Sequence, residues 1–240
     1  MTSRFAETWV YLARSPLLWL TVTVATYAAA EVLHRRLGRH PLVHPVVTSV
    51  AALATLLQVS GTPYPRFFEG AQFVHFLLGP AIVALALPLH RELHREQALA
   101  LPLSVALLAG SVTAIVTAVV TGRLAGASRE TLLSLAPKSA TAPVAMGITE
   151  RLGGLPSLTA SLVVLTGVIG AVIGPALLRR LRVTDPAATG FALGVASHGL
   201  GTARAFELGE TAGAFSGLGM GLNALATSLL VPALMGWLMR

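Results

Sequence analysis

One ammonium group stands out among the basic side chains of this sequence. Lys138 is the only lysine among 17 lysine and arginine residues, and residues 137–143 around it are Pro-Lys-Ser-Ala-Thr-Ala-Pro. At membrane depth such a charge costs at least about 2.5 kcal/mol unless it is paired or hydrated. Lys138 could therefore bind a small organic anion, with the hydroxyl groups of Ser139 and Thr141 and the backbone groups freed by Pro137 and Pro143 completing the site. The alternative is a lysine in a short loop whose ammonium group reaches back to the membrane interface.

A second polar cluster lies in residues 197–204, Ser-His-Gly-Leu-Gly-Thr-Ala-Arg. The planar fork of Arg204 matches a carboxylate, and Gly201 lets a ligand approach the backbone closely. Thr202 could orient that ligand, while His198 or Glu207 could couple its movement to protons. The alternative is structural: Arg204 pairs with Glu207 three residues further on, and His198 is a hydrogen-bonded packing residue.

Glycine and proline mark candidate hinges. Gly79 and Pro80 lie in an apolar stretch, where proline removes a helix hydrogen bond and glycine opens space beside it. A kink that the membrane tolerates is the plainer interpretation. Pro137 and Pro143 are hinge candidates on either side of Lys138.

These side chains need membrane-spanning elements to position them. Of 240 residues, 54% are hydrophobic and 11% charged, whereas about 25% are charged in an average soluble domain. Together with a mean hydropathy of +0.74, this predicts an all-α integral membrane protein with about six to eight transmembrane helices. We interpret residues 1–240 as one membrane domain, with an N-terminal span and basic loop in residues 1–40 and a core in residues 41–240. Six apolar spans are predicted at residues 16–33, 43–59, 73–89, 98–120, 155–178 and 212–238.

Two further stretches, residues 131–149 and 187–208, reach membrane length but contain Gly, Pro, Ser, Thr and a full charge. We predict that both are broken or re-entrant. Three arginine clusters follow spans one, three and five, and they share one side of the membrane only if residues 131–149 enter and leave on the same face. We therefore expect this segment to enter from the outer face and residues 187–208 to enter from the inner face.

The two segments show weak internal sequence similarity. Residues 141–146 are followed by a span that contains Gly-Pro-Ala-Leu at 174–177, and residues 202–206 by one that contains Val-Pro-Ala-Leu at 231–234. Interrupted segments at corresponding places in two halves are typical of a transporter's central site, and they point to an inverted repeat.

Several function classes lack their sequence signatures. The sequence has no cysteine, no Walker A motif and no nucleophile elbow, and no third metal ligand accompanies His90 and His94. The basic residues form short clusters between apolar runs, with no basic stripe for nucleic acid. A membrane hydrolase that uses His198 and Ser216 is a remote alternative. We expect no enzyme activity, cofactor, bound metal or nucleic-acid partner.

Four separate sequence motifs resemble those of a known family. They are Phe-Leu-Leu-Gly-Pro-Ala at 76–81, Pro-Lys-Ser at 137–139, Gly-Gly-Leu-Pro-Ser-Leu-Thr-Ala at 153–160 and His-Gly-Leu-Gly-Thr-Ala-Arg-Ala at 198–205. In this order they resemble the LrgB/CidB family from about Pro41 to the C-terminus. The resemblance implies either an antiholin-like or holin-like regulator of murein hydrolase export and cell lysis, or a carrier of small carboxylates similar to the plastid glycolate/glycerate translocator. It also implies an LrgA/CidA-type membrane partner.

The chain departs from the family pattern at Ala140 and Ala142, where relatives often carry Val and Thr, and at Ile82, where Thr is common. The loss of hydroxyl groups could change the choice of substrate. The family's charged and glycine positions are present as Lys138, His198, Gly201, Thr202, Arg204 and Glu207.

The residues and the resemblance together favour a multi-pass carrier of the cell (inner) membrane. Its expected substrate is a small monocarboxylate of the glycolate, glycerate, pyruvate or acetate type, held by Lys138 and Arg204 and oriented by Ser139 and Thr202. The alternative is the holin-like regulator, in which these residues shape assembly with a partner or in a homo-oligomer.

Overall fold

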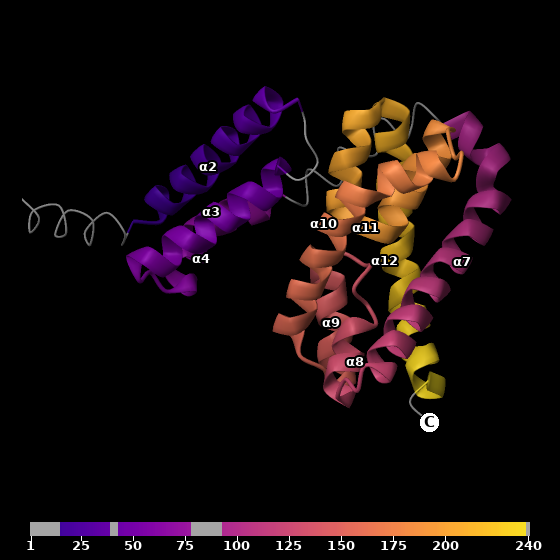
Figure 1. Cartoon of the computed structure of the whole chain (residues 1–240). Coiled ribbons are helices and arrows are strands. Elements are labelled where there is room, and N and C mark those ends of the chain that lie inside the picture. The colour runs from indigo at the N-terminus through magenta and orange to yellow at the C-terminus, as the bar shows by residue number, and fades with distance from the viewer. Residues whose placement is uncertain (1–14, 39–42, 78–92, 239–240) are drawn as a thin grey trace, which may run out of the picture. The chain divides into compact units, whose positions relative to one another are not determined.

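The computed structural model describes residues 15–38, 43–77 and 93–238, and these form helices joined by turns, with no strand among them (Figure 1). The chain divides into two compact units, residues 1–83 and 84–240, which we describe separately. Four helices in the described ranges are long and apolar enough to cross a membrane: Pro16–Arg36, Ala100–Leu124, Pro156–Arg180 and Glu210–Leu238. The predicted all-α, multi-pass membrane protein is thus confirmed.

The first unit contains helices α2 (Pro16–Arg36), α3 (Pro45–Ser60) and α4 (Tyr64–Phe76). Helix α2 corresponds to the first predicted span, and the 16-residue α3 to the second. Helix α4 begins before the predicted start of the third span. The rest of that span, with the hinge candidates Gly79 and Pro80, lies outside the described residues.

Helix α4 packs directly on α2. The rings of Trp19 and Phe67 meet edge to face with their centroids 5.8 Å apart. A Cβ atom on Gly70 would overlap the backbone of α2 at the carbonyl oxygen of Pro16, so only glycine permits this approach. The first unit therefore has a small core of its own.

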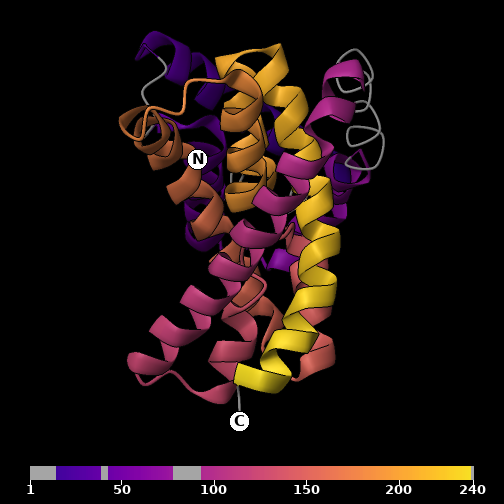
Figure 2. The ribbon, with the colours of Figure 1, turned by 90° about the vertical axis from the view of Figure 1, so that its right-hand side faces the viewer.

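The second unit contains helices α7 (Leu93–Leu124), α8 (Arg129–Leu135), α9 (Ala142–Leu152), α10 (Pro156–Arg180), α11 (Pro186–Leu208) and α12 (Glu210–Leu238). Helices α7, α10 and α12 correspond to the predicted spans 98–120, 155–178 and 212–238. At 1.5 Å per residue, the 25-residue α10 is about 37 Å long, enough to cross a hydrocarbon core of about 30 Å. Helices α7 and α12 run side by side in the same direction (Figure 2), and Arg123 donates a hydrogen bond to the carbonyl oxygen of Leu238 where both end.

Helices α8 and α9 form a first hairpin. The chain leaves the helical conformation at residues 136–141, which we call the first interruption, and Pro143 lies in the first turn of α9, where proline needs no hydrogen-bond partner. The backbone N–H of Leu155, just beyond α9, donates to the hydroxyl of Ser134 in α8 (2.8 Å). Thr159 of α10 donates to the Ser134 carbonyl oxygen (3.0 Å). Helix α9 therefore runs back beside α8, and residues 131–149 are re-entrant.

The segment labelled α11 consists of two helical halves that form a second hairpin. Ser197 (φ −134°, ψ 16°) and His198 (φ 42°, ψ −132°) leave the helical region, and we call these two residues the second interruption. Residues eight apart in a straight helix lie about 12 Å apart, yet a Cβ atom on Gly201 would overlap the carbonyl oxygen of Leu193. The chain therefore reverses at the interruption, and Ala205 packs against Leu193 in one buried cluster.

The two hairpins enter the second unit from opposite ends. The first hairpin ends where α10 begins, at Pro156, and the second begins just after α10 ends, at Arg180. Each hairpin is followed by a long helix, α10 or α12, and these two helices run in opposite directions. This arrangement is that of the inverted repeat predicted from the internal sequence similarity.

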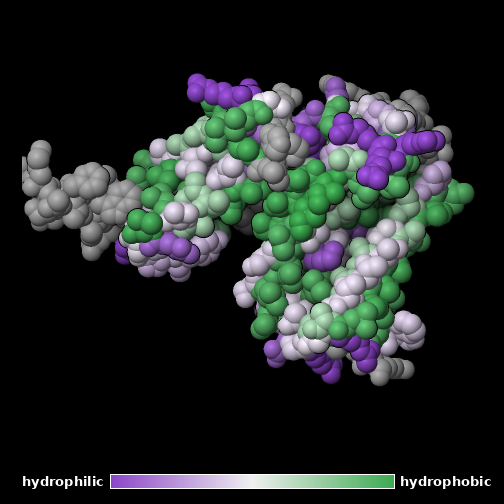
Figure 3. Space-filling view, viewed as in Figure 1, coloured by the Kyte–Doolittle hydropathy of each residue, from purple (hydrophilic) through white to green (hydrophobic). Residues whose placement is uncertain are grey.

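Large apolar side chains face outward along the long helices. On α10 they include Leu165 (55% exposed) and Ile173, and on α12 Leu225 and Leu229. The space-filling view shows broad hydrophobic surfaces with hydrophilic groups gathered at the ends of the second unit (Figure 3). Such a surface is expected where the surrounding solvent is a bilayer.

Candidate functional site

The two interruptions meet at one cavity in the second unit. This central cavity has a volume of about 700 Å³, and its walls are largely apolar side chains of α7, α10 and α11. Its polar lining residues are Lys138, Ser139, Thr166, Asp185 and Ser197. Figure 3 shows hydrophilic atoms at the floor of a hollow between hydrophobic walls. Lys138 and Ser139 from the first interruption thus share a cavity with Ser197 from the second.

Turns hold the first interruption in place. The backbone N–H of Lys138 donates to the carbonyl oxygen of Leu135 (3.2 Å), and that of Ala140 donates to Pro137 (3.0 Å). The Lys138 ammonium group donates to the Ser139 hydroxyl at 3.4 Å. Within the described residues Lys138 forms no ion pair, although the carboxylate of Asp185 lines the same cavity.

The second interruption brings an unusual hydroxyl to the cavity. Ser197 is 1% exposed, and its Oγ atom has no hydrogen-bond partner within the described ranges. The next residue, His198, donates from Nε2 to the carbonyl oxygen of Val163 on α10 (2.9 Å). His198 does not line the cavity, and this contact is the packing role that the sequence left open for it.

Glycines on α10 let the second interruption approach. A Cβ atom on Gly170 would overlap the hydroxyl of Ser197, and one on Gly167 would lie 2.6 Å from the imidazole of His198. A residue larger than glycine at either position would displace α11. Gly201, predicted to let a ligand approach, instead lets the two halves of α11 pack together.

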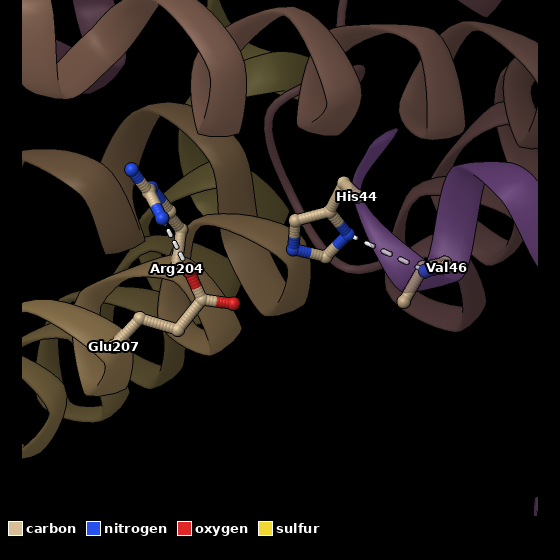
Figure 4. A network of polar contacts seen from close by, with 4 residues as sticks. All are labelled: His44, Val46, Arg204 and Glu207. Atoms are coloured by element: carbon tan, nitrogen blue, oxygen red, sulfur yellow. Dashed lines mark hydrogen bonds and ion pairs between the residues drawn. The ribbon is translucent and has the colours of Figure 1, made fainter. Parts of the chain in front are cut away.

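Arg204 lies at a different place. It pairs with Glu207 one turn further along α11, as Figure 4 shows, and its Nε atom is buried with no partner in the described part of the chain. Arg204 and Arg179 line a second cavity of about 330 Å³, whose lining shares no residue with that of the central cavity. The structure therefore does not bring Lys138 and Arg204 together in one cavity, and the ion pair corresponds to the structural alternative.

Neither threonine candidate lines the central cavity. Thr141 is the residue before the first turn of α9 and does not line the central cavity. Thr202 donates to the carbonyl oxygen of His198 (3.0 Å) and accepts from Ser216 (3.1 Å). Pro137 is fully buried in the first interruption.

Sequence reasoning missed two residues of this region. Ser197 was quoted only as the start of a motif, although it lines the cavity. Asn223 of α12, 1% exposed, donates to the carbonyl oxygen of Ser139 (2.9 Å). It is the only asparagine of the chain and lies within a predicted apolar span, which is the signal that could have identified it.

Comparison with known proteins agrees with the resemblance in the sequence. The LrgB-like family matches residues 23–237, so the match begins before Pro41. The uncharacterized protein YxaC of Bacillus subtilis is 36% identical over 219 residues, which cover 91% of this chain and 94% of YxaC. The holin-like protein CidB of Staphylococcus epidermidis is 31% identical over 90% of this chain and 94% of its own length, and CidB of Staphylococcus aureus is 30% identical over 91% and 95%. No solved structure matches. With a family match over most of its length and relatives of this identity, the chain belongs to the LrgB-like family.

Proposed function

We propose that this protein carries a small organic anion across the membrane and binds it in the central cavity. The observation that carries the proposal is the meeting of two interrupted hairpins at a cavity that holds the Lys138 ammonium group and the buried Ser197 hydroxyl, neither of which has an acidic partner in the described chain. A carboxylate would supply the missing opposite charge and hydrogen-bond acceptor. The proposal includes no catalytic step and no cofactor.

The cavity fits one negative charge with a short apolar body. Among the described lining residues Lys138 is the one base and Asp185 the one acid, whose carboxylate accepts from the backbone N–H of Ala188; Ser139, Thr166 and Ser197 supply hydroxyl groups. Ile169, Phe191 and Val195 are among its apolar walls. A volume of about 700 Å³ leaves room for a monocarboxylate together with water that hydrates the ammonium group.

The hairpins suggest how the anion would reach the cavity from either side. In this proposal each hairpin acts as a gate between the cavity and one end of the second unit, because the chain of each turns back at its interruption. Movement of one hairpin at a time would expose the cavity to alternating sides. In this mechanism Lys138 is the one cation that binds the anion, and the Arg204–Glu207 pair serves the structure of the second hairpin.

A holin-like role is the second candidate, and the relatives' names favour it more than the carrier. Two relatives that cover 90% or more of this chain are named holin-like protein CidB. In that role the protein would regulate lysis by assembly in the membrane, with copies of itself or with an LrgA/CidA-type partner. Such a role needs no saturable selectivity for a carboxylate.

Uptake into liposomes that contain the pure protein separates the two candidates. Labelled pyruvate, glycolate, glycerate and acetate would be tested with wild type, Lys138→Ala and Arg129→Ala. Arg129 is exposed at the start of the first hairpin, so its variant removes one charge outside the cavity. Release of an entrapped dye would be measured in the same vesicles.

A carrier gives saturable uptake of at least one acid, lost in Lys138→Ala and retained in Arg129→Ala, without dye release. Dye release, or no saturable uptake of any acid by correctly folded protein, would replace the carrier by the holin-like role.

A further inference from the structure

Helix α12 carries a buried polar group that reaches the first interruption. Asn223 donates from Nδ2 to the carbonyl oxygen of Ser139, and its Oδ1 atom accepts from Ser111 of α7 (2.7 Å) and from Thr227 (3.4 Å). One side chain thus links α7, α12 and the first interruption. All its polar atoms are used, which is what a buried amide requires.

The same helix also reaches the second interruption. Ser216 donates to Thr202, whose hydroxyl donates to the carbonyl oxygen of His198. Ser216 and Asn223 are seven residues apart, so they lie on one face of α12, two turns or about 10.5 Å apart. Helix α12 is therefore linked to one peptide carbonyl of each interruption, directly at Ser139 and through Thr202 at His198.

The bond from Asn223 acts on the peptide between Ser139 and Ala140, one residue beyond Lys138. In the interruption the Ser139 carbonyl has left the regular helix pattern, and a buried carbonyl without a partner is costly. The orientation of this peptide holds the backbone at Ser139, and through Ser139 it restrains the neighbouring Lys138. Both side chains line the central cavity.

We propose that Asn223 is a positioning residue of the anion site: it fixes the first interruption so that the Lys138 ammonium group faces the central cavity. This inference rests on the proposed function for its purpose, but its geometry can be tested without transport. Asn223 itself does not line the cavity and would not touch the anion.

The chain offers a matched pair of reporters, because it has no cysteine. Ser139→Cys and Ser197→Cys each place one nearly isosteric thiol in the cavity lining, one at each interruption. The Asn223 bond goes to the backbone of Ser139, so the first reporter leaves it in place. The measurement is the rate at which a small sulfonate-bearing methanethiosulfonate modifies each thiol in the full-length protein.

Variants at Asn223 and Ser216 test the two interruptions independently. Asn223→Ala should raise the modification rate of the thiol at position 139 by about tenfold and leave that at position 197 within about twofold, since one lost buried hydrogen bond shifts a local equilibrium by about that factor. Ser216→Ala should raise the modification rate of the thiol at position 197 by about tenfold and leave that at position 139 within about twofold. Asn223→Asp keeps the size and the acceptor for Ser111 but removes the Nδ2 donor, so it should act like Asn223→Ala at position 139.

General loosening of the fold would raise the rates at both positions together, and this result would overturn the proposal. So would an unchanged rate at position 139 in both Asn223 variants. Where wild type transports an acid, Asn223→Ala should raise the half-saturating concentration about tenfold with a smaller change in maximal rate. If no acid is transported but the thiol at 139 alone responds, the positioning role stands and the carrier function fails.

Discussion

Gly170 of α10 and Ser197 of α11 are in such close contact that a single added methyl group on Gly170 would overlap the serine hydroxyl. This contact places the second interruption against the wall of the central cavity, which both residues line. The hydroxyl of Ser197 is held at the cavity by packing alone, because it has no hydrogen-bond partner in the described chain.

Gly170→Ala should displace the second interruption. Because the neighbour is the rigid turn of a hairpin, we expect a loss of about 1–3 kcal/mol in the free energy of unfolding. Thermal unfolding in detergent would measure it. Gly221→Ala on α12 is the matched control, since no atom lies within 4 Å of its added Cβ; it should be neutral or stabilising by up to about 1 kcal/mol. Equal effects of the two variants would contradict the close contact.

Ser197→Ala should separate binding from folding. The hydroxyl makes no hydrogen bond to any described residue, so its loss should change the free energy of unfolding by less than about 0.5 kcal/mol. Loss of its bond to an anion should weaken binding about tenfold. Thr159→Val is the contrast: this fully buried hydroxyl bonds to Ser134 and Thr149, so its loss should destabilise by about 1–3 kcal/mol. Thermal unfolding with and without the transported acid would measure both effects.

If Ser197→Ala destabilises as much as Thr159→Val in the absence of anion, the hydroxyl has a structural partner and is not a ligand for the anion.

Lys138→Met should stabilise the empty protein and abolish its response to anions. The variant keeps most of the side chain and removes a partly buried charge that has no acidic partner among the described residues. The unfolding temperature without anion should rise, whereas wild type alone should gain stability as the concentration of the bound acid is increased. Arg129→Met controls for the loss of one positive charge. An anion-dependent shift that persists in Lys138→Met would remove Lys138 from the site.

The sequence was sufficient to predict the long helices of the second unit but not the residues that they contact. The interruption in residues 131–149 was predictable because prolines and a charge interrupt an apolar run, and proline cannot continue a helix ladder. The second interruption contains no proline, and its turn at His198 depends on glycines of α10 that are distant in sequence. The re-entrant path of residues 131–149 followed from arginine placement, because positive loops favour one side of the membrane.

The set of residues that form the site was harder to predict, because contacts between helices distant in sequence bring those residues together. Arg204 has a carboxylate one turn away, and a local pair of this kind competes with any distant ligand. Asn223 lies in an apolar span where hydropathy masks a single polar residue, and its importance appears only once Ser111 and Ser139 are placed around it. Sequence spacing gives the face of α12 on which Asn223 lies, but not which helix packs on that face.

The Arg204–Glu207 pair decides whether one cation or two serves the anion. Both side chains are mostly buried, at 15% and 23% exposed, so either single variant, Arg204→Gln or Glu207→Gln, should cost about 1–3 kcal/mol by leaving a charge without this partner. The double variant should cost less than the sum, with a coupling of about 1–3 kcal/mol in the free energy of unfolding. The exposed pair Glu31–Arg35 on α2 is the control and should couple by about 0.3–0.5 kcal/mol. A coupling for Arg204 and Glu207 as small as that of the control would mean that the guanidinium group is available to an anion, and would restore the two-cation hypothesis that the separate cavities argue against.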